Sequence, residues 1–140
     1  IQPQRADRGD RLVLKDTWTK GGRAREIPIR NEEQRQTLDE AKVLARSGSL
    51  VAPGSNYALQ LRRFEHQCEI ASISKVHGHR HQYAQLRYKE LTGWSAPAAG
   101  GPESKELSQE QKYADNLARL VISRELGHDR ESVVSVYVGR

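Results

Sequence analysis

The sequence predicts an α+β fold that is mostly helical, with a small antiparallel β-sheet at the N-terminus followed by about five helices. Near the N-terminus, apolar residues recur with a period of two on both sides of a glycine-rich turn, which is typical of a β-hairpin. From residue 31 onward they recur at the three- and four-residue spacing of amphipathic helices. We expect residues 1–140 to form a single domain, with a hairpin region over residues 1–30 and a helical region over residues 31–140.

The hairpin is predicted from two short segments with alternating apolar residues. RLVLKDTW (11–18) alternates its two leucines with polar neighbours, and REIPI (25–29) spaces its two isoleucines in the same way. The turn TKGGRA between them contains paired glycines, which tolerate the positive φ angles of tight turns. Pro28 has no N–H to donate, so the second strand should lie at a sheet edge or end there.

The first two predicted helices each carry an apolar stripe. Asn31 begins the first helix, with Gln34 as its capping-box partner, and Gly48 ends it. The second helix follows the loop APGSN (52–56). The residues expected to be buried are Leu38, Ala41, Leu44 and Ala45 on the first helix, and Tyr57, Leu61, Phe64 and Cys68 on the second. The single cysteine excludes an internal disulfide, and we expect it to be a buried, inert thiol.

Three further helices are predicted in the second half of the chain. One covers residues 77–91 and is followed by a loop over residues 93–106 that is dense in Gly, Pro, Ala and Ser. The next opens with a Ser-x-x-Gln capping box, covers residues 108–126 and ends at Gly127. A short last helix is expected at about residues 130–138.

Composition and charge limit the classes of function. Lys and Arg number 23 against 18 Asp and Glu, giving a formal net charge of +5 and a pI near 9.6, which favours a polyanionic partner. No window approaches the ~18 apolar residues that span a membrane, and no signal peptide is visible. We therefore expect a cytoplasmic protein without a membrane partner. Because the chain begins at Ile1 and contains no methionine, we also expect it to be a piece of a longer protein.

KVHGHRHQYAQLRY (75–88) gathers three histidines and two arginines. A metal site is a poor interpretation, because only His77 and His81 would share a helix face and Arg80 sets a permanent positive charge beside any cation. No metal and no cofactor are expected. A solvated, basic helix start remains the simplest alternative for this stretch when it is considered alone.

Three separated motifs together resemble the tyrosine recombinases, the phage-integrase family. HGHRH resembles the family's His-x-x-Arg-His box, with His77 and Arg80 at the motif positions. ELGHDRESVVSVYVGR is similar to its C-terminal signature, with His128 in a Leu-Gly-His corner and Tyr137 nine residues later. TKGGRAREIPI resembles the hairpin that carries the family's lysine, here Lys20. The motifs occur in the family's order and cover most of the chain.

The resemblance implies site-specific DNA recombination through a 3′-phosphotyrosine intermediate. Tyr137 would be the nucleophile, and His77 would help to remove its proton. Arg80 and His128 would bind the phosphoryl oxygens, and Lys20 would protonate the departing 5′-oxygen. The expected partners are double-stranded DNA and, in the full-length protein, further copies of the chain in a tetramer on DNA. Further DNA contacts are expected from Arg23 and Arg25 on the basic hairpin and from His81.

The sequence departs from the family pattern in two places. The family has another arginine in an earlier box, Gly-x-Arg-x-x-Glu, whereas Arg5, Arg8 and Arg11 lie in a turn-rich segment without those flanking residues. We expect that arginine and a DNA-clamping domain to lie upstream, so that this chain alone is poorly active. The spacing from Arg80 to His128 is also longer than usual, and the excess falls in residues 93–110.

Other interpretations stay open. A DNA-binding module without strand cleavage, either a degenerate recombinase or a helix-turn-helix-like regulator, would share the corner at Gly127. Topoisomerases of the related tyrosine type share the chemistry. An RNA-binding domain is disfavoured, because exposed aromatic pairs for base stacking are lacking. Among single residues, Tyr137 could be a core aromatic, Lys20 a solvated lysine, His128 a helix cap, and Arg80 the partner of an acid such as Glu90.

Overall fold

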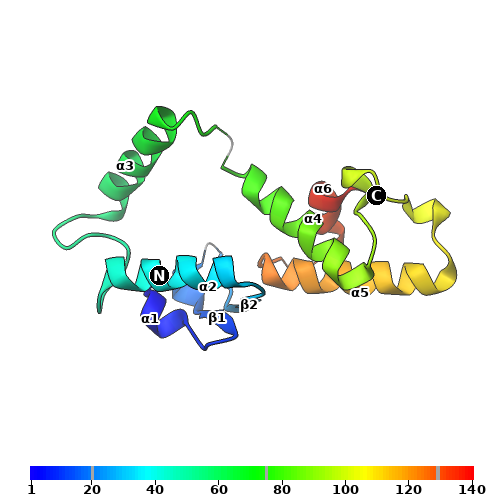
Figure 1. Ribbon diagram of the computed structural model, residues 1–140, viewed down its shortest axis with the longest axis horizontal. Coiled ribbons are helices and arrows are strands. Elements are labelled where there is room, and N and C mark those ends of the chain that lie inside the picture. The colour runs from blue at the N-terminus through cyan, green and yellow to red at the C-terminus, as the bar shows by residue number, and fades with distance from the viewer. Residues whose placement is uncertain (20, 75, 129) are drawn as a thin grey trace. The chain divides into compact units, whose positions relative to one another are not determined.

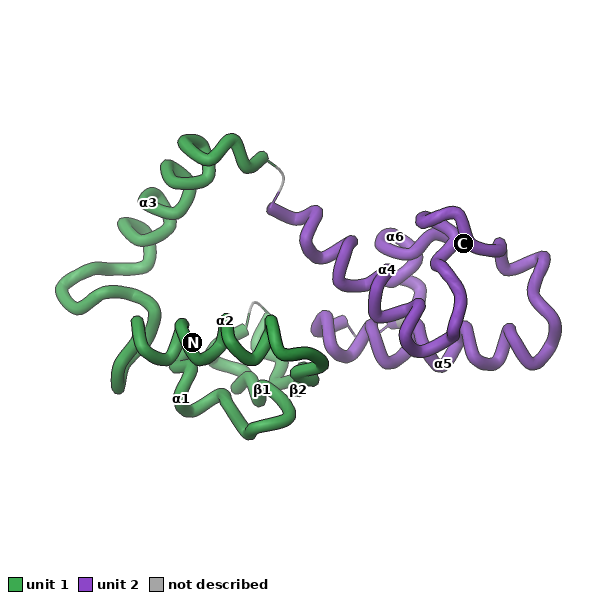
Figure 2. Tube along the Cα trace, viewed as in Figure 1, with its two compact units in different colours: residues 1–74 green, residues 75–140 purple. Residues whose placement is uncertain are grey.

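The fold of the computed structural model is α+β and mostly helical, with a two-stranded antiparallel sheet near the N-terminus, as predicted (Figure 1). The structure describes residues 1–19, 21–74, 76–128 and 130–140. They divide into two compact units, unit 1 over Ile1–Ser74 and unit 2 over Lys75–Arg140 (Figure 2). The single domain expected over the whole chain stays a prediction. Among the described residues, no helix combines the length and the apolar character needed to cross a membrane.

The predicted hairpin is present in unit 1. Strand β1 (Arg11–Leu14) pairs antiparallel with β2 (Arg25–Pro28), and the first residue of β1 lies opposite the last residue of β2. Pro28 therefore ends the ladder, where its missing N–H removes no internal hydrogen bond. The first strand is shorter than predicted, because the chain turns into a 3-10 helix at Asp16–Trp18.

Helix α2 (Glu32–Ala45) begins as the sequence predicts. The Asn31 side chain accepts a hydrogen bond from the Gln34 N–H at 2.9 Å, and the Gln34 side chain accepts one from the Arg30 N–H at 2.8 Å. The short helix α1 (Pro3–Ala6), in a segment expected to be turn-rich, packs against α2 and β1.

Asp7 links the segment after α1 to α2. Its carboxylate accepts hydrogen bonds from the Arg35 guanidinium at 2.7 and 3.1 Å and from Lys42 Nζ at 2.8 Å. Arg35 also donates to the carbonyl of Gly9 at 3.0 Å. The hydrogen bonds from Arg35 hold the pKa of Asp7 well below its usual range, with a further contribution from Lys42. This carboxylate therefore fastens the N-terminal segment to the middle of α2.

The apolar stripes predicted to be buried in unit 1 are largely exposed. Helix α3 (Tyr57–Ile70) forms where expected, but it has no buried residue: Tyr57 is 73% exposed, and Leu61 and Phe64 are exposed as well. Cys68 is half-buried, so the expectation of a buried thiol is wrong. On α2, Leu44 is 79% exposed, and only Ala45 of the predicted stripe is buried. Periodicity fixes which residues share a helix face but not which element covers that face, and α3 stands apart from α2 and the hairpin (Figure 1).

Unit 2 is built on two long helices that pack against each other. Helix α4 (Gly78–Thr92) ends at Gly93 in the left-handed conformation, and α5 (Gln109–Glu125) opens with the predicted capping box, in which both hydrogen bonds are present. The expected loop between them contains 3-10 helices at Pro97–Ala99 and Ser104–Glu106. The core of unit 2 consists of Ala84, Tyr88, Ala96, Ala118, Ile122, Leu126, Val134, Tyr137 and Val138.

The expected last helix is divided in two. A 3-10 helix over Glu131–Val134 leads directly into α6 (Ser135–Val138). Helix α6 packs against α4 and against the 3-10 helix at Pro97–Ala99. The chain end therefore returns to the start of the connection between the two long helices.

Two buried carboxylates on α5 join it to α4. Glu125, which is 7% exposed, accepts hydrogen bonds from the Arg87 guanidinium at 2.9–3.2 Å and from the Tyr83 hydroxyl at 2.8 Å. Asp115, also buried, accepts a hydrogen bond from the Tyr88 hydroxyl at 2.5 Å. Burial raises the pKa of Tyr88 to about 12, and the neighbouring carboxylate adds to this, so the hydroxyl keeps its proton and remains a donor.

Asp7→Asn should destabilise the protein by about 2 kcal/mol near neutral pH, because two cations lose a charged acceptor. The lowered pKa of Asp7 contributes stability that is fully present above the ordinary value of 3.8 and is lost as the pH falls through the folded-state pKa. Urea unfolding followed by circular dichroism at pH 7 and pH 3 would measure both effects. Asp10→Asn, at an exposed carboxylate beside Arg11, is the matched control, and equal losses in the two variants would contradict the prediction.

Candidate active site

The first turn of α4 places three candidate side chains on one helix face. Positions 77, 80 and 81 are related by three and four residues, the spacing of neighbours along a helix face. The rings of His77 and His81 are accordingly close, with centres 6.2 Å apart in an edge-on arrangement. His79, between them in sequence, is exposed. Arg80 is half-buried, so the motif presents its guanidinium toward the packed side of the helix.

A Schellman motif at the end of α5 places His128. Gly127, with a φ of 77°, donates its N–H to the Arg124 carbonyl at 3.0 Å, and the His128 N–H reaches the Ser123 carbonyl at 2.8 Å. The Ser123 hydroxyl is buried within hydrogen-bond distance of the carbonyls of His128 and Arg130, at 3.2 and 3.0 Å. The Leu-Gly-His corner is therefore a helix end whose geometry depends on a glycine.

Tyr137, on α6, lies among the histidines and the arginine of these two segments. Its hydroxyl is 3.4 Å from His128 Nε2, and the two rings are stacked with centres 6.0 Å apart. The ring centre of His81 is 4.9 Å away in an edge-on contact, and that of His77 is 6.3 Å away. The guanidinium carbon of Arg80 lies 5.7 Å from the phenol ring centre. The tyrosine side chain is only 6% exposed.

Arg80 is fixed by the end of α5. Its Nη2 donates to the Leu126 carbonyl at 2.9 Å and lies 3.4 Å from His128 Nε2. A cation is favoured at this position, because the last carbonyls of a helix lack partners within it. Its buried Nε has no hydrogen-bond partner among the described residues. Glu90, the acid that the sequence offered as an alternative partner, forms an ion pair with Arg87 at 3.2 Å.

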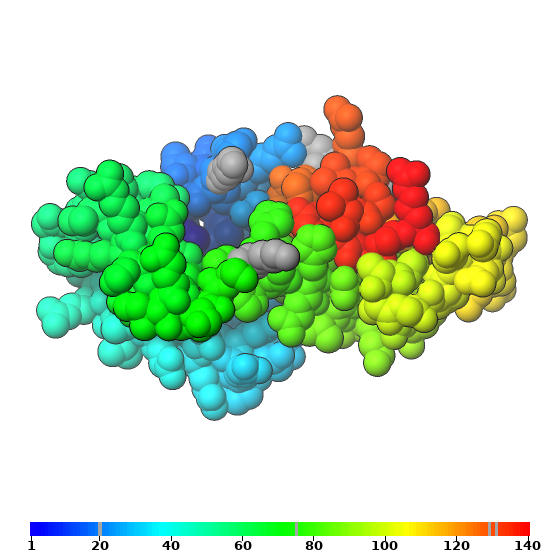
Figure 3. Space-filling model, turned by 90° about the horizontal axis from the view of Figure 1, so that it is seen from above, coloured from blue at the N-terminus to red at the C-terminus, as the bar shows by residue number. Residues whose placement is uncertain are grey.

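Four of the five predicted catalytic side chains, those of His77, Arg80, His128 and Tyr137, therefore meet in unit 2, and His81 joins them. In the space-filling view, the C-terminal residues lie next to those of α4 (Figure 3). The predicted lysine, Lys20, lies outside the described residues. Arg23 and Arg25 belong to the hairpin of unit 1, and Arg25 is the first residue of β2.

Gln85 and Arg119 were not identified from the sequence. Gln85 Nε2 donates to the Tyr137 carbonyl at 3.0 Å, and Arg119 Nη1 donates to the Gly139 carbonyl at 2.9 Å. A sequence signal exists only for Gln85, which follows His81 by four residues and so shares its helix face. Its acceptor is 52 residues away, so only the tertiary structure identifies the contact.

The side chains gathered here are of the types that nucleophilic chemistry on an anionic substrate uses. A phenol lies beside an imidazole nitrogen that can exchange a proton with it, and a permanent cation stands over the ring. The separation of 3.4 Å is loose, as is common in sites without substrate. In the described part of the chain, no group of three or more His, Cys, Asp or Glu is arranged to hold a metal ion.

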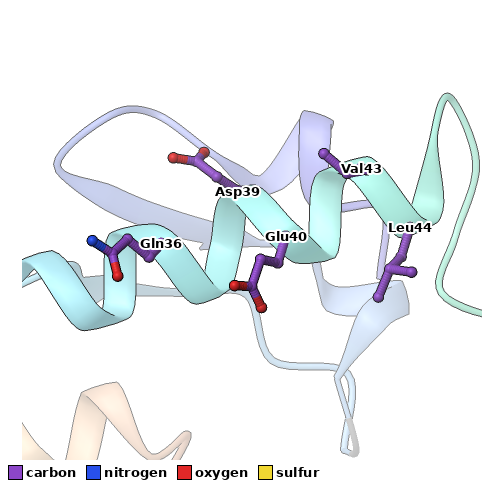
Figure 4. A pocket seen from close by; sticks show the side chains of 5 residues that line it. All are labelled: Gln36, Asp39, Glu40, Val43 and Leu44. Atoms are coloured by element: carbon purple, nitrogen blue, oxygen red, sulfur yellow. The ribbon is translucent and has the colours of Figure 1, made fainter.

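A pocket of about 590 Å³ lies elsewhere, on α2 of unit 1 (Figure 4). It is lined by Gln36, Asp39, Glu40, Val43 and Leu44. Asp39 already accepts hydrogen bonds from Arg35 at 3.1 Å and Lys42 at 3.0 Å. Its described lining contains no histidine, tyrosine, serine or cysteine, so it lacks the residue types that the sequence motifs bring together in unit 2.

Gly127→Ala should destabilise the protein by about 1 kcal/mol and displace His128, because alanine is strained at a φ of 77°. The matched control is Gly100→Ala, which has a similar φ of 82° and open space around the added Cβ, far from the histidines in sequence. Both variants should lose similar stability in urea unfolding. Only Gly127→Ala should lose the nuclear Overhauser contact between the His128 and Tyr137 rings, and a retained contact would refute this role of the corner.

Comparison with known proteins returned no match to this chain, neither with a family model, nor with a curated protein, nor with a solved structure. The likeness to tyrosine recombinases therefore rests on the three sequence motifs. The chemical argument rests on the side chains that α4, the corner and α6 bring together.

Proposed function

We propose that this chain is the carboxy-terminal catalytic domain of a site-specific tyrosine recombinase, which breaks and rejoins DNA through a 3′-phosphotyrosine intermediate. The observation that supports this most directly is the position of the Tyr137 hydroxyl, 3.4 Å from His128 Nε2. The Arg80 guanidinium stands 5.7 Å from the centre of the same ring. The three residues come from two separate motifs, HGHRH and the C-terminal signature, and their convergence has a chemical purpose in phosphoryl transfer.

The reaction is a transesterification. The Tyr137 oxygen attacks the scissile phosphorus, a bond from phosphorus to the phenol oxygen forms, and the bond to the 5′-oxygen breaks. The phenol proton passes to a histidine, and the 5′-oxygen receives a proton as it leaves, a role that the resemblance gives to Lys20. A 5′-hydroxyl later attacks the phosphotyrosine and restores the DNA backbone. The ester conserves the bond energy, so the reaction needs no nucleotide cofactor.

Arg80 and the histidines are assigned charge stabilisation and proton transfer in this reaction. The guanidinium stabilises the negative charge that gathers on the non-bridging oxygens, and its unpartnered Nε supplies a donor for them. His128 is the imidazole beside the phenol oxygen, and no hydrogen bond among the described residues joins His77 to that oxygen. We therefore assign the first proton transfer to His128, with His77 as a donor to the phosphate, the reverse of the roles that the resemblance suggests.

Tyr137 must become more accessible for this reaction. At 6% exposure its hydroxyl cannot meet a phosphate of duplex DNA without a local displacement of α6 or of the histidines. Helix α6 has four residues, a length that can move as a local unit without unfolding the core helices. DNA binding through the net charge of +5, with Arg23, Arg25 and His81 as proposed contacts, would supply the energy for this change.

A DNA-binding module without cleavage is the second candidate. The specific observation in its favour is that Tyr137 belongs to the apolar core of unit 2. In that case the histidines and Arg80 would stabilise the corner, and the net charge of +5 would still favour DNA binding.

Tyr137→Phe in the full-length protein should abolish the covalent adduct with DNA and leave DNA affinity unchanged. Nicked suicide duplexes from a random-sequence pool provide the substrate, and adducts are recovered by detergent–potassium precipitation. Tyr113→Phe is the matched control, because Tyr113 is 69% exposed on α5. Binding without adduct in the wild-type protein would favour the second candidate, and absence of DNA binding would refute both.

Arg80→Lys should lower the rate of adduct formation about 100- to 1000-fold, because lysine cannot form the planar two-donor contact with the phosphate. Lysine can still donate to the Leu126 carbonyl, so the melting temperature should change little. The 140-residue chain alone should form little adduct, because the earlier arginine box is missing from it. Efficient adduct formation by the chain alone would show that this arginine is dispensable.

A further inference from the structure

We propose that Gln85 and Arg119 are positioning residues, which hold the backbone at Tyr137 and two residues after it and so set the phenol against His128 and Arg80. Gln85 binds the carbonyl of Tyr137 itself, and Arg119 binds the carbonyl of Gly139 two residues later. The catalytic consequence rests on the proposed function, whereas the backbone contacts themselves do not.

Helix α6 needs such contacts because it is too short to hold its own position. It spans Ser135–Val138, and a hydrogen bond from the Gly139 N–H to the Ser135 carbonyl, 2.9 Å long, closes its turn. Isolated helices below ~12 residues are marginal in water, so tertiary contacts determine where the tyrosine lies.

Gln85 ties α6 to the helix that carries the histidine motif. His77, His81 and Gln85 follow one another at intervals of four residues, so they form one row along α4. The first two contact the Tyr137 ring, and the third donates to its carbonyl at 3.0 Å. A single helix face thus fixes both the ring and the backbone of the tyrosine. Because the amide is uncharged, this contact does not change with pH.

The Arg119 side chain is also held in place by contacts outside α6. It is 8% exposed, and its Nε donates to both carboxylate oxygens of Asp115 at 2.8 and 3.0 Å. Asp115 also accepts from the Tyr88 hydroxyl, and the Arg119 guanidinium carbon lies 5.7 Å from the Tyr88 ring centre. Because the hydrogen bonds from Nε to Asp115 fix the plane of the guanidinium, Nη1 points at the Gly139 carbonyl.

Gly139 allows the chain to pass close to the neighbouring segment. Its φ is 81°, and an added Cβ would lie 2.8 Å from the Ala98 nitrogen and 3.1 Å from the Pro97 Cβ. The backbone after Tyr137 is therefore confined between Arg119 and the 3-10 helix at Pro97–Ala99. This confinement, the Gln85 contact and the buried Val138 restrict α6 from three directions.

The test is the chemical accessibility of Tyr137 in the chain without DNA. Gln85→Met keeps the length of the side chain and removes the donor. Tyrosine nitration by tetranitromethane, read by peptide mass spectrometry, should rise about fivefold at Tyr137 relative to Tyr113, the shift expected from the loss of one neutral hydrogen bond. Gln82→Met, at an exposed position of the same helix, should leave the ratio unchanged.

An unchanged nitration ratio in Gln85→Met, or an equal rise in Gln82→Met, would overturn the proposal. If circular dichroism shows that Gln85→Met does not fold, Arg119→Lys takes its place. Lysine retains the charge beside Asp115 and loses the second arm that reaches Gly139, so the same rise is expected.

Adduct formation by the full-length protein tests whether this positioning matters for catalysis. Gln85→Met should lower the rate of adduct formation about tenfold with an unchanged dissociation constant for DNA, because misplacement of a nucleophile affects the chemical step. A purely structural role would instead lower the rate of adduct formation, the affinity for DNA and the melting temperature together. If the wild-type protein forms no adduct, the proposed function fails, and the nitration result still decides whether Gln85 positions Tyr137.

Discussion

The hydrogen bond from Arg80 to the Leu126 carbonyl connects the start of α4 to the end of α5, and the rest of the site depends on it. The carbonyl is available because the helix ends there, and Gly127 then turns the chain so that His128 faces the guanidinium. Arg80 thereby completes a helix end and, in the proposed reaction, also supplies a donor for the phosphate. Loss of the hydrogen-bond donor at position 80 would therefore also remove part of the framework of the site.

The buried ion pairs of unit 2 determine which parts can move. Glu125 with Arg87, and Asp115 with Arg119, are removed from water and hydrogen-bonded on several sides, so breaking either is costly. They hold α4, α5 and the chain end in one arrangement. Helix α6 is attached to this framework through two backbone carbonyls and a few apolar side chains. Local displacement of α6 would expose the phenol while leaving these ion pairs intact.

The sequence predicted the helix ends correctly where they depend on residues close together in the chain. The cap at Asn31, the capping box of α5 and the glycine at the corner depend on residues within four positions of one another, and the structure has all three. The sequence did not predict which residues of unit 1 are buried. The apolar stripe that includes Phe64 identifies one face of a helix, but it does not show whether another element packs on that face. Gln85 could not be recognised for the same reason, since a glutamine on a helix acquires its role only from a carbonyl far along the chain. The proximity of Arg80, His128 and Tyr137 was expected from the resemblance alone, because their spacing along the chain does not predict it.

The protonated Tyr88 has a consequence for work at alkaline pH. Since burial raises the pKa of Tyr88 to about 12, the stability that its neutral form contributes is fully present below pH 10 and is lost only as the pH rises from there toward 12. Reagents that attack phenolates act in mildly basic buffer, well under that range. Tyr88 therefore stays protonated at the pH at which the other tyrosines of the chain are labelled. Its contact with Asp115, and through it the position of Arg119, should persist while those tyrosines are studied by spectroscopy.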